Sequence, residues 1–175
     1  MVEKHKQFII QRKSKFQGQR KVGIDSCVLI DFIDTPFVTQ YQQLKIFGPA
    51  DLFFTHPICK SETIAILSDK KRLSSEEAEK QVSEFLINNN ISLVELGKGD
   101  SLLVHFRADC KNHNVEIHEP DDFILVDFKA CGINKIYSTN NHFLEAAKLL
   151  GMEADKVPTI ENQMKRIISK TIFKR

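Results

Sequence analysis

The sequence predicts an α/β fold, a three-layer α/β/α sandwich with a mainly parallel central sheet. Short apolar segments typical of buried strands alternate with longer segments of helical periodicity along the 175 residues. A helix between two strands implies a right-handed crossover and therefore parallel pairing. The length suits one domain. We divide it into a basic N-terminal extension (1–20), a main domain (21–160) and a basic C-terminal tail (161–175).

The first part of the main domain contains two predicted strands. Residues 21–24 form a short apolar strand, and Asp25 follows it as the cap of an apolar helix. A second helix over residues 40–47 ends at a Gly-Pro pair, and residues 52–54 form the next strand. Pro57 suits the first turn of the helix after that strand, because its missing N–H has no partner there.

The rest of the main domain alternates in the same way. A Ser-Ser-Glu-Glu capping box opens one helix, and a proline followed by two acids opens another that ends at a glycine. The predicted elements are a helix over 74–88, a strand over 91–96, helices over 101–112 and 121–131, a strand over 136–138, a helix over 143–150, and an edge strand over 157–160 that leads into a basic tail helix.

Charge is divided unevenly along the chain. Residues 1–21 carry seven Lys or Arg and one acid, and residues 165–175 carry five Lys or Arg and no acid. Since the whole chain has a net charge of +2, residues 22–164 hold −9. An acidic centre suits a cation site, and basic ends suit nucleic-acid phosphates. The alternative is that the charged ends only keep the protein soluble.

Composition argues against a membrane or zinc protein. No run of eighteen apolar residues occurs, and basic residues interrupt the first twenty where a signal peptide would be apolar. We therefore expect a cytoplasmic protein without a membrane partner. The four cysteines have no C-x-x-C spacing and lie in or beside apolar segments, which indicates free core thiols.

Carboxylates stand where strands end or helices begin. Asp25 follows the first strand, Glu62 lies about one turn into the helix after the second, and Asp121 and Asp122 open an apolar helix. Ligands of parallel sheets bind at the carboxyl ends of the strands. Carboxylates gathered there repel one another unless a cation compensates them, and hard oxygen ligands favour Mg²⁺ or Mn²⁺. Each acid also has an ordinary interpretation as a helix cap, a helix-dipole partner or a solvated side chain.

Four segments carry acidic or amide side chains in a recurring order. They are 21–29, with the first acid, 54–62, with the Glu, 121–125, with the third acid, and 138–143, similar to a Thr-x-Asp (or Asn)-x-x-Phe pattern. Together they resemble the PIN (PilT N-terminal) domains, a family of metal-dependent nucleases. The resemblance covers residues 21 to about 152 in the order and approximate spacing of the family, and departs from it at Asn140, where many members carry Asp.

The resemblance implies a PIN-like nuclease domain that hydrolyses RNA through an acidic metal cluster, either as a toxin or in RNA processing. It implies Mg²⁺ or Mn²⁺ as cofactor, and RNA, an antitoxin or other protein, and a second copy of the chain as partners. In the resemblance, the catalytic metal ligands are Asp25, Glu62 and Asp122, with Asp121 as a substitute or further ligand. Ser26 and Asn140 orient water or support the ligands. The residues expected to bind RNA are Arg12, Lys13, Lys15 and Arg20.

Two other interpretations stay open at this point. Asn140 keeps a carbonyl but lacks a charge, so one alternative is a catalytically weak or inactive PIN-like RNA-binding or scaffold module. A phosphate-accepting receiver domain would also place acids after strands. That fold requires a Lys after its last strand, for which the sequence has no clear candidate.

Overall fold

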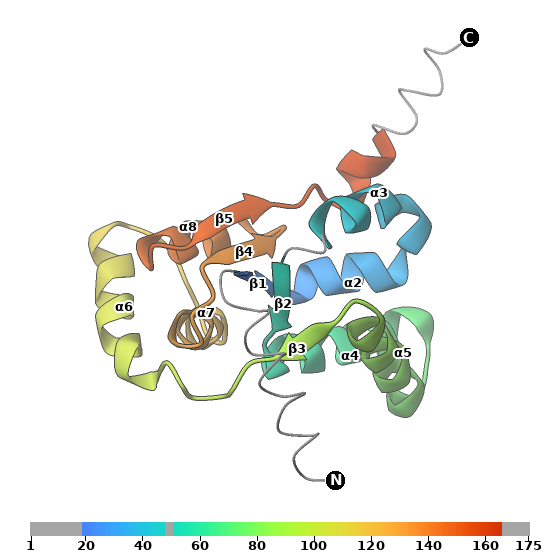
Figure 1. Cartoon of the computed structure of the whole chain (residues 1–175), viewed down its shortest axis with the longest axis horizontal. Coiled ribbons are helices and arrows are strands. Elements are labelled where there is room, and N and C mark those ends of the chain that lie inside the picture. Colours follow the sequence, from blue (N-terminus) through green and yellow to red (C-terminus); the bar gives the residue numbers. More distant parts are fainter. Residues whose placement is uncertain (1–18, 48–50, 166–175) are drawn as a thin grey trace, which may run out of the picture.

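The computed structural model describes residues 19–47 and 51–165, which form a parallel sheet with helices on both faces (Figure 1). All neighbouring strands pair in parallel, in the order β3-β2-β1-β4-β5. The predicted three-layer α/β/α sandwich is confirmed. The strands are β1 (Arg20–Ile24), β2 (Asp51–Thr55), β3 (Ile91–Leu93), β4 (Lys135–Ser138) and β5 (Glu153–Lys156).

The strand order excludes the receiver fold and places Asp25 centrally. Receiver domains have the order 2-1-3-4-5, whereas here β1 lies between β2 and β4. Ile24 pairs with Thr55 on one side and with Tyr137 on the other. The residue after Ile24 therefore emerges in the middle of the carboxyl edge of the sheet.

Two hydrophobic clusters bind the helices to the two faces of the sheet. One joins α6, α7 and α8 to one face, and the other joins α2, α4 and α5 to the opposite face (Figure 1). Among the described residues, none of the helices combines the length and apolarity needed to cross a bilayer. The helices are α2 (Ser26–Asp34), α3 (Pro36–Ile46), α4 (Pro57–Lys71), α5 (Ser75–Asn88), α6 (Asp100–Asn112), α7 (Asp121–Ala130) and α8 (Asn141–Leu149).

The prediction of an edge strand over residues 157–160 was wrong. The edge strand is β5, which precedes those residues, and the chain is helical again over 160–165. Three of the four β5 residues are exposed and only Ala154 is apolar, so the sequence carries no periodic signal for this strand. Pairing with β4 determines it instead.

Candidate active site

Asp25 is fixed by four groups at the carboxyl edge of the sheet. It caps α2, where its Oδ1 accepts the backbone N–H of Ser26 at 2.7 Å. Its Oδ2 accepts the hydroxyl of Ser138 at 2.5 Å and the thiol of Cys27 at 3.0 Å. Its own backbone N–H donates to the carbonyl of Tyr137 at 3.1 Å. With 6% of its surface exposed, the carboxylate has little freedom to move.

Ser138 connects Asp25 to the start of α8. Its buried hydroxyl accepts the backbone N–H of Asn140 at 2.9 Å while it donates to Asp25. The side-chain oxygen of Asn140 caps α8 by accepting the N–H of His142 at 3.0 Å. Sequence reasoning named Ser26 and Asn140 as supporting residues and gave Ser138, the first residue of the fourth matching segment, no role of its own. The signal was available, because Ser138 is the last, hydroxyl-bearing residue of the strand beside β1.

Two cysteines contact the same carboxylate. Cys59 on α4 is buried, with its Sγ 3.9 Å from Asp25 Oδ1. Burial, followed by the charge of Asp25, raises the pKa of Cys27 to about 12. The same two causes, together with the charge of Glu62, raise the pKa of Cys59 well above its ordinary value. Both thiols therefore stay protonated at neutral pH and act as weak donors around Asp25.

Asp121 is electrostatically coupled to Asp25 and Glu62. It opens α7 and is half-buried, and its pKa is raised to about 6. Burial is the largest cause, followed by the charges of Asp25, Glu62 and Asp122, with His118 opposing them. Carboxylates from the end of β1, from α4 and from α7 thus act on one another across the carboxyl edge.

Asp122 points to a different neighbour from Asp121. Only 2% of it is exposed, and its Oδ2 accepts the Nε–H of Arg107 at 2.6 Å while its Oδ1 accepts the N–H of Phe123 at 2.8 Å. Arg107 also pairs with Glu119 at 2.6 Å. The charge of Asp122 is therefore compensated within the fold. Of the two neighbouring acids, Asp121, the substitute or further ligand of the sequence prediction, is the one whose pKa the charges of Asp25 and Glu62 raise.

The acidic residues do not form a closed metal cage. Within the part of the chain that the structure describes, no three His, Cys, Asp or Glu side chains lie close enough together to hold a metal ion as they stand. The donor set still fits a hard divalent cation, because half-buried carboxylates that raise the pKa of Asp121 favour a compensating positive charge. Binding would require Glu62 and Asp121 to move toward Asp25.

A buried hydrogen-bond network holds α4, α7 and a loop together beside these acids. The Nδ1 of His56 accepts the N–H of Ile58 at 3.1 Å, so Nε2 carries the ring hydrogen and donates to Asp127 at 3.1 Å. Asp127 also accepts the N–H of Gly97 at 2.8 Å and that of Gly99 at 2.6 Å. The network fixes the two helices that carry Glu62 and Asp121.

Close backbone packing explains one glycine of this loop. A Cβ built on Gly99 would lie 2.2 Å from the carbonyl carbon of Val126, a backbone atom of α7. No side chain fits there without moving the helix or the loop. Gly99 therefore allows the loop to approach α7 closely enough for Asp127 to accept both backbone N–H groups.

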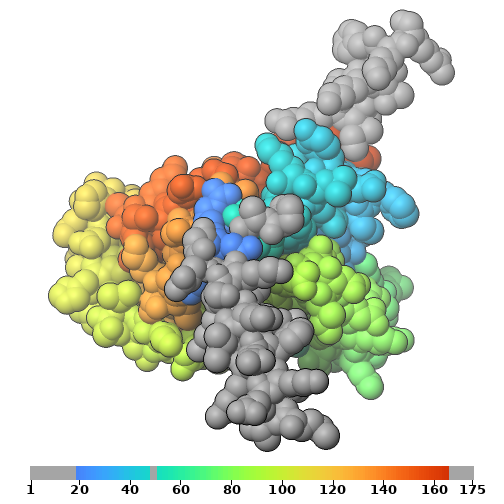
Figure 2. Space-filling view, in the orientation of Figure 1, coloured from blue at the N-terminus to red at the C-terminus, as the bar shows by residue number. Residues whose placement is uncertain are grey.

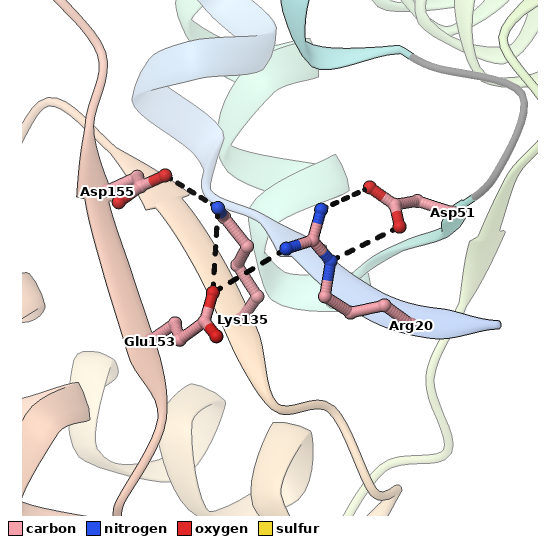
Figure 3. Close-up of polar contacts among 5 residues, drawn as sticks. All are labelled: Arg20, Asp51, Lys135, Glu153 and Asp155. Carbon is pink, nitrogen blue, oxygen red and sulfur yellow. Dashed lines mark hydrogen bonds and ion pairs between the residues drawn. The ribbon is translucent and has the colours of Figure 1, made fainter. Parts of the chain in front are cut away.

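Arg20 belongs to an ion-pair network across four strands (Figure 3). It forms a two-point contact with Asp51, at 2.9 and 3.2 Å, and its third nitrogen lies 3.6 Å from Glu153. Lys135 contacts Glu153 at 3.6 Å and Asp155 at 2.6 Å. Arg20 is the first residue of β1, so this network lies at the amino ends of the strands. Asp25 follows the other end of β1.

That position bears on two sequence predictions. Arg20 was predicted to bind RNA and to end the N-terminal extension, yet it is the first residue of β1 and is already paired with acids. The other predicted RNA-binding residues, Arg12, Lys13 and Lys15, lie outside the described residues. RNA binding by this set therefore stays a prediction.

Comparison with known proteins shows the fold. No protein-family model and no curated protein sequence matches the chain. Solved structures that match include VapBC2 from Rickettsia felis bound to a promoter DNA fragment, with a TM-score of 0.61 and 12% identity over 78% of this chain and 98% of that one. DNA-bound VapBC from Salmonella typhimurium has a TM-score of 0.59 and 14% identity over 79% and 98% of the two chains. VapBC-1 from nontypeable Haemophilus influenzae has a TM-score of 0.58 and 11% identity over 78% and 97%. At these identities the likeness concerns the fold alone. The resemblance noted in the sequence is confirmed at that level, and the chain has the PIN-like α/β/α fold of these VapBC chains.

Proposed function

We propose that the chain is a metal-dependent ribonuclease in which Asp25, Glu62 and Asp121 hold Mg²⁺ or Mn²⁺. The observation that carries the proposal is the placement of three carboxylates, directly after β1, on α4 and at the start of α7. There the charges of Asp25 and Glu62 add to burial in raising the pKa of Asp121. Three carboxylates that repel one another at the carboxyl ends of parallel strands lower the stability of the folded protein unless a cation compensates their charge. The PIN-like fold is consistent with a nuclease.

The surrounding residues prepare the carboxylates for this role. The Ser138 hydroxyl, the Cys27 thiol and the Ser26 N–H hold the Asp25 carboxylate in one orientation, because all three donate to its oxygens. A bound Mg²⁺ would supply a more acidic water and neutralise charge on the phosphate. Asn140 is exposed, and its backbone N–H donates to the Ser138 hydroxyl that in turn donates to Asp25. Its role in orienting water is part of the proposal.

RNA and a protein partner complete the proposal. The basic segments at both ends suit a phosphate backbone, and the similar VapBC structures were solved as complexes, two of them with DNA. We infer that this chain also works with a protein partner, as a toxin or as an RNA-processing enzyme. Its free thiols suit the reducing cytoplasm.

Asp25→Asn is expected to reduce metal-dependent RNA cleavage by about a hundredfold or more. The substitution removes a charged ligand, and a loss of about 3 kcal/mol in the transition state corresponds to roughly that factor. Cleavage of a single-stranded RNA should be measured with Mg²⁺, with Mn²⁺ and with a chelator. Asp69→Asn, an exposed acid on α4, is the matched control and should cleave like the wild type.

A second readout separates metal binding from catalysis. Mn²⁺ should raise the melting temperature of the wild type and of Asp69→Asn, because a ligand that binds only the folded state stabilises it. Asp25→Asn should show a much smaller rise. If the wild type binds RNA and Mn²⁺ but cleaves nothing, the alternative of an inactive RNA-binding module is correct.

Deletion of residues 1–18 is expected to weaken RNA binding and to flatten its dependence on salt. The segment carries five Lys or Arg and one acid, and each phosphate contact with single-stranded RNA contributes about 0.7 to the logarithmic salt slope. Affinity should be measured at several salt concentrations for the full chain and for the deletion. Equal slopes for both proteins would show that the N-terminal segment does not contact phosphates.

A further inference from the structure

A cavity of about 500 Å³ is lined by α6, the start of α7 and the loop between them. Its volume is typical of pockets that bind small molecules. Figure 2 shows α6, in yellow, at the left end of the molecule. Asp122 lines the cavity and follows Asp121 directly, and its backbone N–H donates to the carbonyl of His118 at 3.4 Å. The cavity therefore reaches the start of α7, beside the residue that we propose as a metal ligand.

The charges of the cavity suit a neutral ligand better than a phosphate. Its lining has two basic side chains that are charged at neutral pH, Arg107 and Lys111, and three carboxylates, those of Glu116, Glu119 and Asp122. A phosphate group therefore meets a net negative charge there. Three further lining residues are apolar, namely Cys110, Val115 and Ile117. A ligand of this cavity combines apolar surface with polar edges.

Arg107 presents a planar group that is already fixed. Its Nε–H donates to Asp122 at 2.6 Å, and a terminal nitrogen donates to Glu119 at 2.6 Å. Its Cζ lies 5.3 Å from the ring centroid of Phe123, so that ring covers one side of the guanidinium. The side chain of Arg107 is still 44% exposed, and it lines the cavity. Because it is held at both ends, it loses little conformational freedom when a ligand stacks on it.

We propose that this cavity binds an unpaired base of the RNA substrate, stacked on the guanidinium of Arg107. Proteins recognise single-stranded RNA by stacking its bases on aromatic rings or on Arg guanidinium planes. A base is neutral and flat, and its edges carry donors and acceptors that suit the carboxylates and Lys111 of the cavity. The inference rests on the proposed ribonuclease function, in which the cleaved phosphate lies at the metal and the base of a nearby nucleotide lies here.

Arg107→Lys is expected to weaken the binding of a short oligoadenylate about tenfold, which is a common contribution of one stacked base. Lys keeps a cation beside Asp122 and the same net charge, but it has no planar group on which a base can stack. Affinity should be measured with a chelator, which prevents cleavage, at several salt concentrations. The salt dependence should stay that of the wild type, because no phosphate contact is lost.

The matched control is Arg72→Lys, the same substitution at an exposed residue after α4. It should bind oligoadenylate like the wild type. Circular dichroism of both variants should match the wild type. If a folded Arg107→Lys binds as tightly as Arg72→Lys, a base does not stack on Arg107.

An abasic oligonucleotide of the same length tests whether the base is the ligand. It carries the same phosphates, so the wild type should bind it about tenfold more weakly than oligoadenylate, and Arg107→Lys should lose most of this preference. AMP should bind far more weakly than oligoadenylate, because it lacks the neighbouring phosphates. Equal affinity of the wild type for both oligonucleotides overturns the inference. Equal affinity for AMP and oligoadenylate indicates a site for free nucleotides and also overturns it.

A tryptophan at the rim of the cavity reports where the base lies. The chain has no native Trp. His118 lines the cavity and its side chain is 78% exposed, so His118→Trp gives a single local signal. Oligoadenylate should change its fluorescence and the abasic oligonucleotide should not. Ile87→Trp, at an exposed position on α5 (73%), is the control and should not respond. Equal responses at both positions, or none at His118→Trp, overturn the inference, and this reporter decides the question even where Arg107→Lys does not fold.

Cleavage kinetics separate the failure of this inference from the failure of the proposed function. Arg107→Lys should need more RNA to reach half of its maximal rate but should reach the maximal rate of the wild type, because a stacked base contributes equally before and during the reaction. If Arg107→Lys binds and cleaves like the wild type, the inference fails and the nuclease proposal stands. If the wild type prefers oligoadenylate to the abasic oligonucleotide but cleaves no RNA with Mg²⁺ or Mn²⁺, the nuclease proposal fails and the base site stands.

Discussion

Replacing Asp121 with Asn is expected to abolish metal-dependent cleavage and, at the same time, to make the metal-free protein more stable at pH 7. Activity should fall by about a hundredfold or more, because a charged ligand is lost. Stability should rise, because Asp121 is half-buried and is ionised there against the charges of Asp25 and Glu62. The two measurements are an RNA cleavage assay and a thermal melt in the presence of a chelator.

The raised pKa of Asp121 also predicts how the stability of the metal-free protein changes with pH. The pKa of Asp121 is about 6 in the folded chain and about 3.9 in an unfolded one. Between these values the folded state binds more protons, so its stability falls as pH rises from about 4 to 6 and stays lower above that range. The full difference corresponds to about 3 kcal/mol. Because Asp121 is partly exposed, solvent screening reduces it to about 1 kcal/mol, or about 2–4 °C in melting temperature.

Asp122→Asn is the matched comparison, since it removes the same charge one residue away. Asp122 is paired with Arg107 at 2.6 Å, so this substitution should destabilise the protein rather than stabilise it. Any loss of cleavage should then follow the loss of folded protein. If instead Asp122→Asn eliminates cleavage by a fully folded protein, and Asp121→Asn does not, the ligand is Asp122.

Asp127→Asn is expected to have the largest effect on stability, lowering the free energy of unfolding by about 3 kcal/mol or more. The carboxylate accepts hydrogen bonds from His56, Gly97 and Gly99, and 3% of the residue is exposed. An Asn of the same shape turns an NH₂ group toward donors and leaves at least one buried N–H unpaired. Urea denaturation, monitored by circular dichroism, measures the change.

An exposed acid provides the control for this prediction. Asp109 is exposed on α6, and Asp109→Asn should change the free energy of unfolding by less than about 0.5 kcal/mol. RNA cleavage by Asp127→Asn should fall as well, since the network fixes the helices that carry Glu62 and Asp121. A loss of less than about 1 kcal/mol would mean that the loop over residues 97–99 and α7 are held together mainly by other contacts.

The sequence by itself determined the types of most elements and the parallel pairing of the strands. Helical periodicity, capping residues and short apolar strands are local features, and a helix between two strands leads to parallel pairing. The same local pattern placed Asp25 at the carboxyl edge, because it is the first polar residue after β1. β5 was predicted at the wrong residues because it buries little and has no apolar pattern.

Only the tertiary structure decided which side chains meet at the site. Asp121 and Asp122 are neighbours in the sequence, but successive residues of a helix point about 100° apart. The packing of α7 pairs Asp122 with Arg107, while Asp121 remains under the charges of Asp25 and Glu62. Ser138 reaches Asp25 across 113 positions of the chain, and Asp127 reaches His56 across 71. Such contacts depend on strand order and helix rotation, which the burial of the whole core determines and no local pattern records.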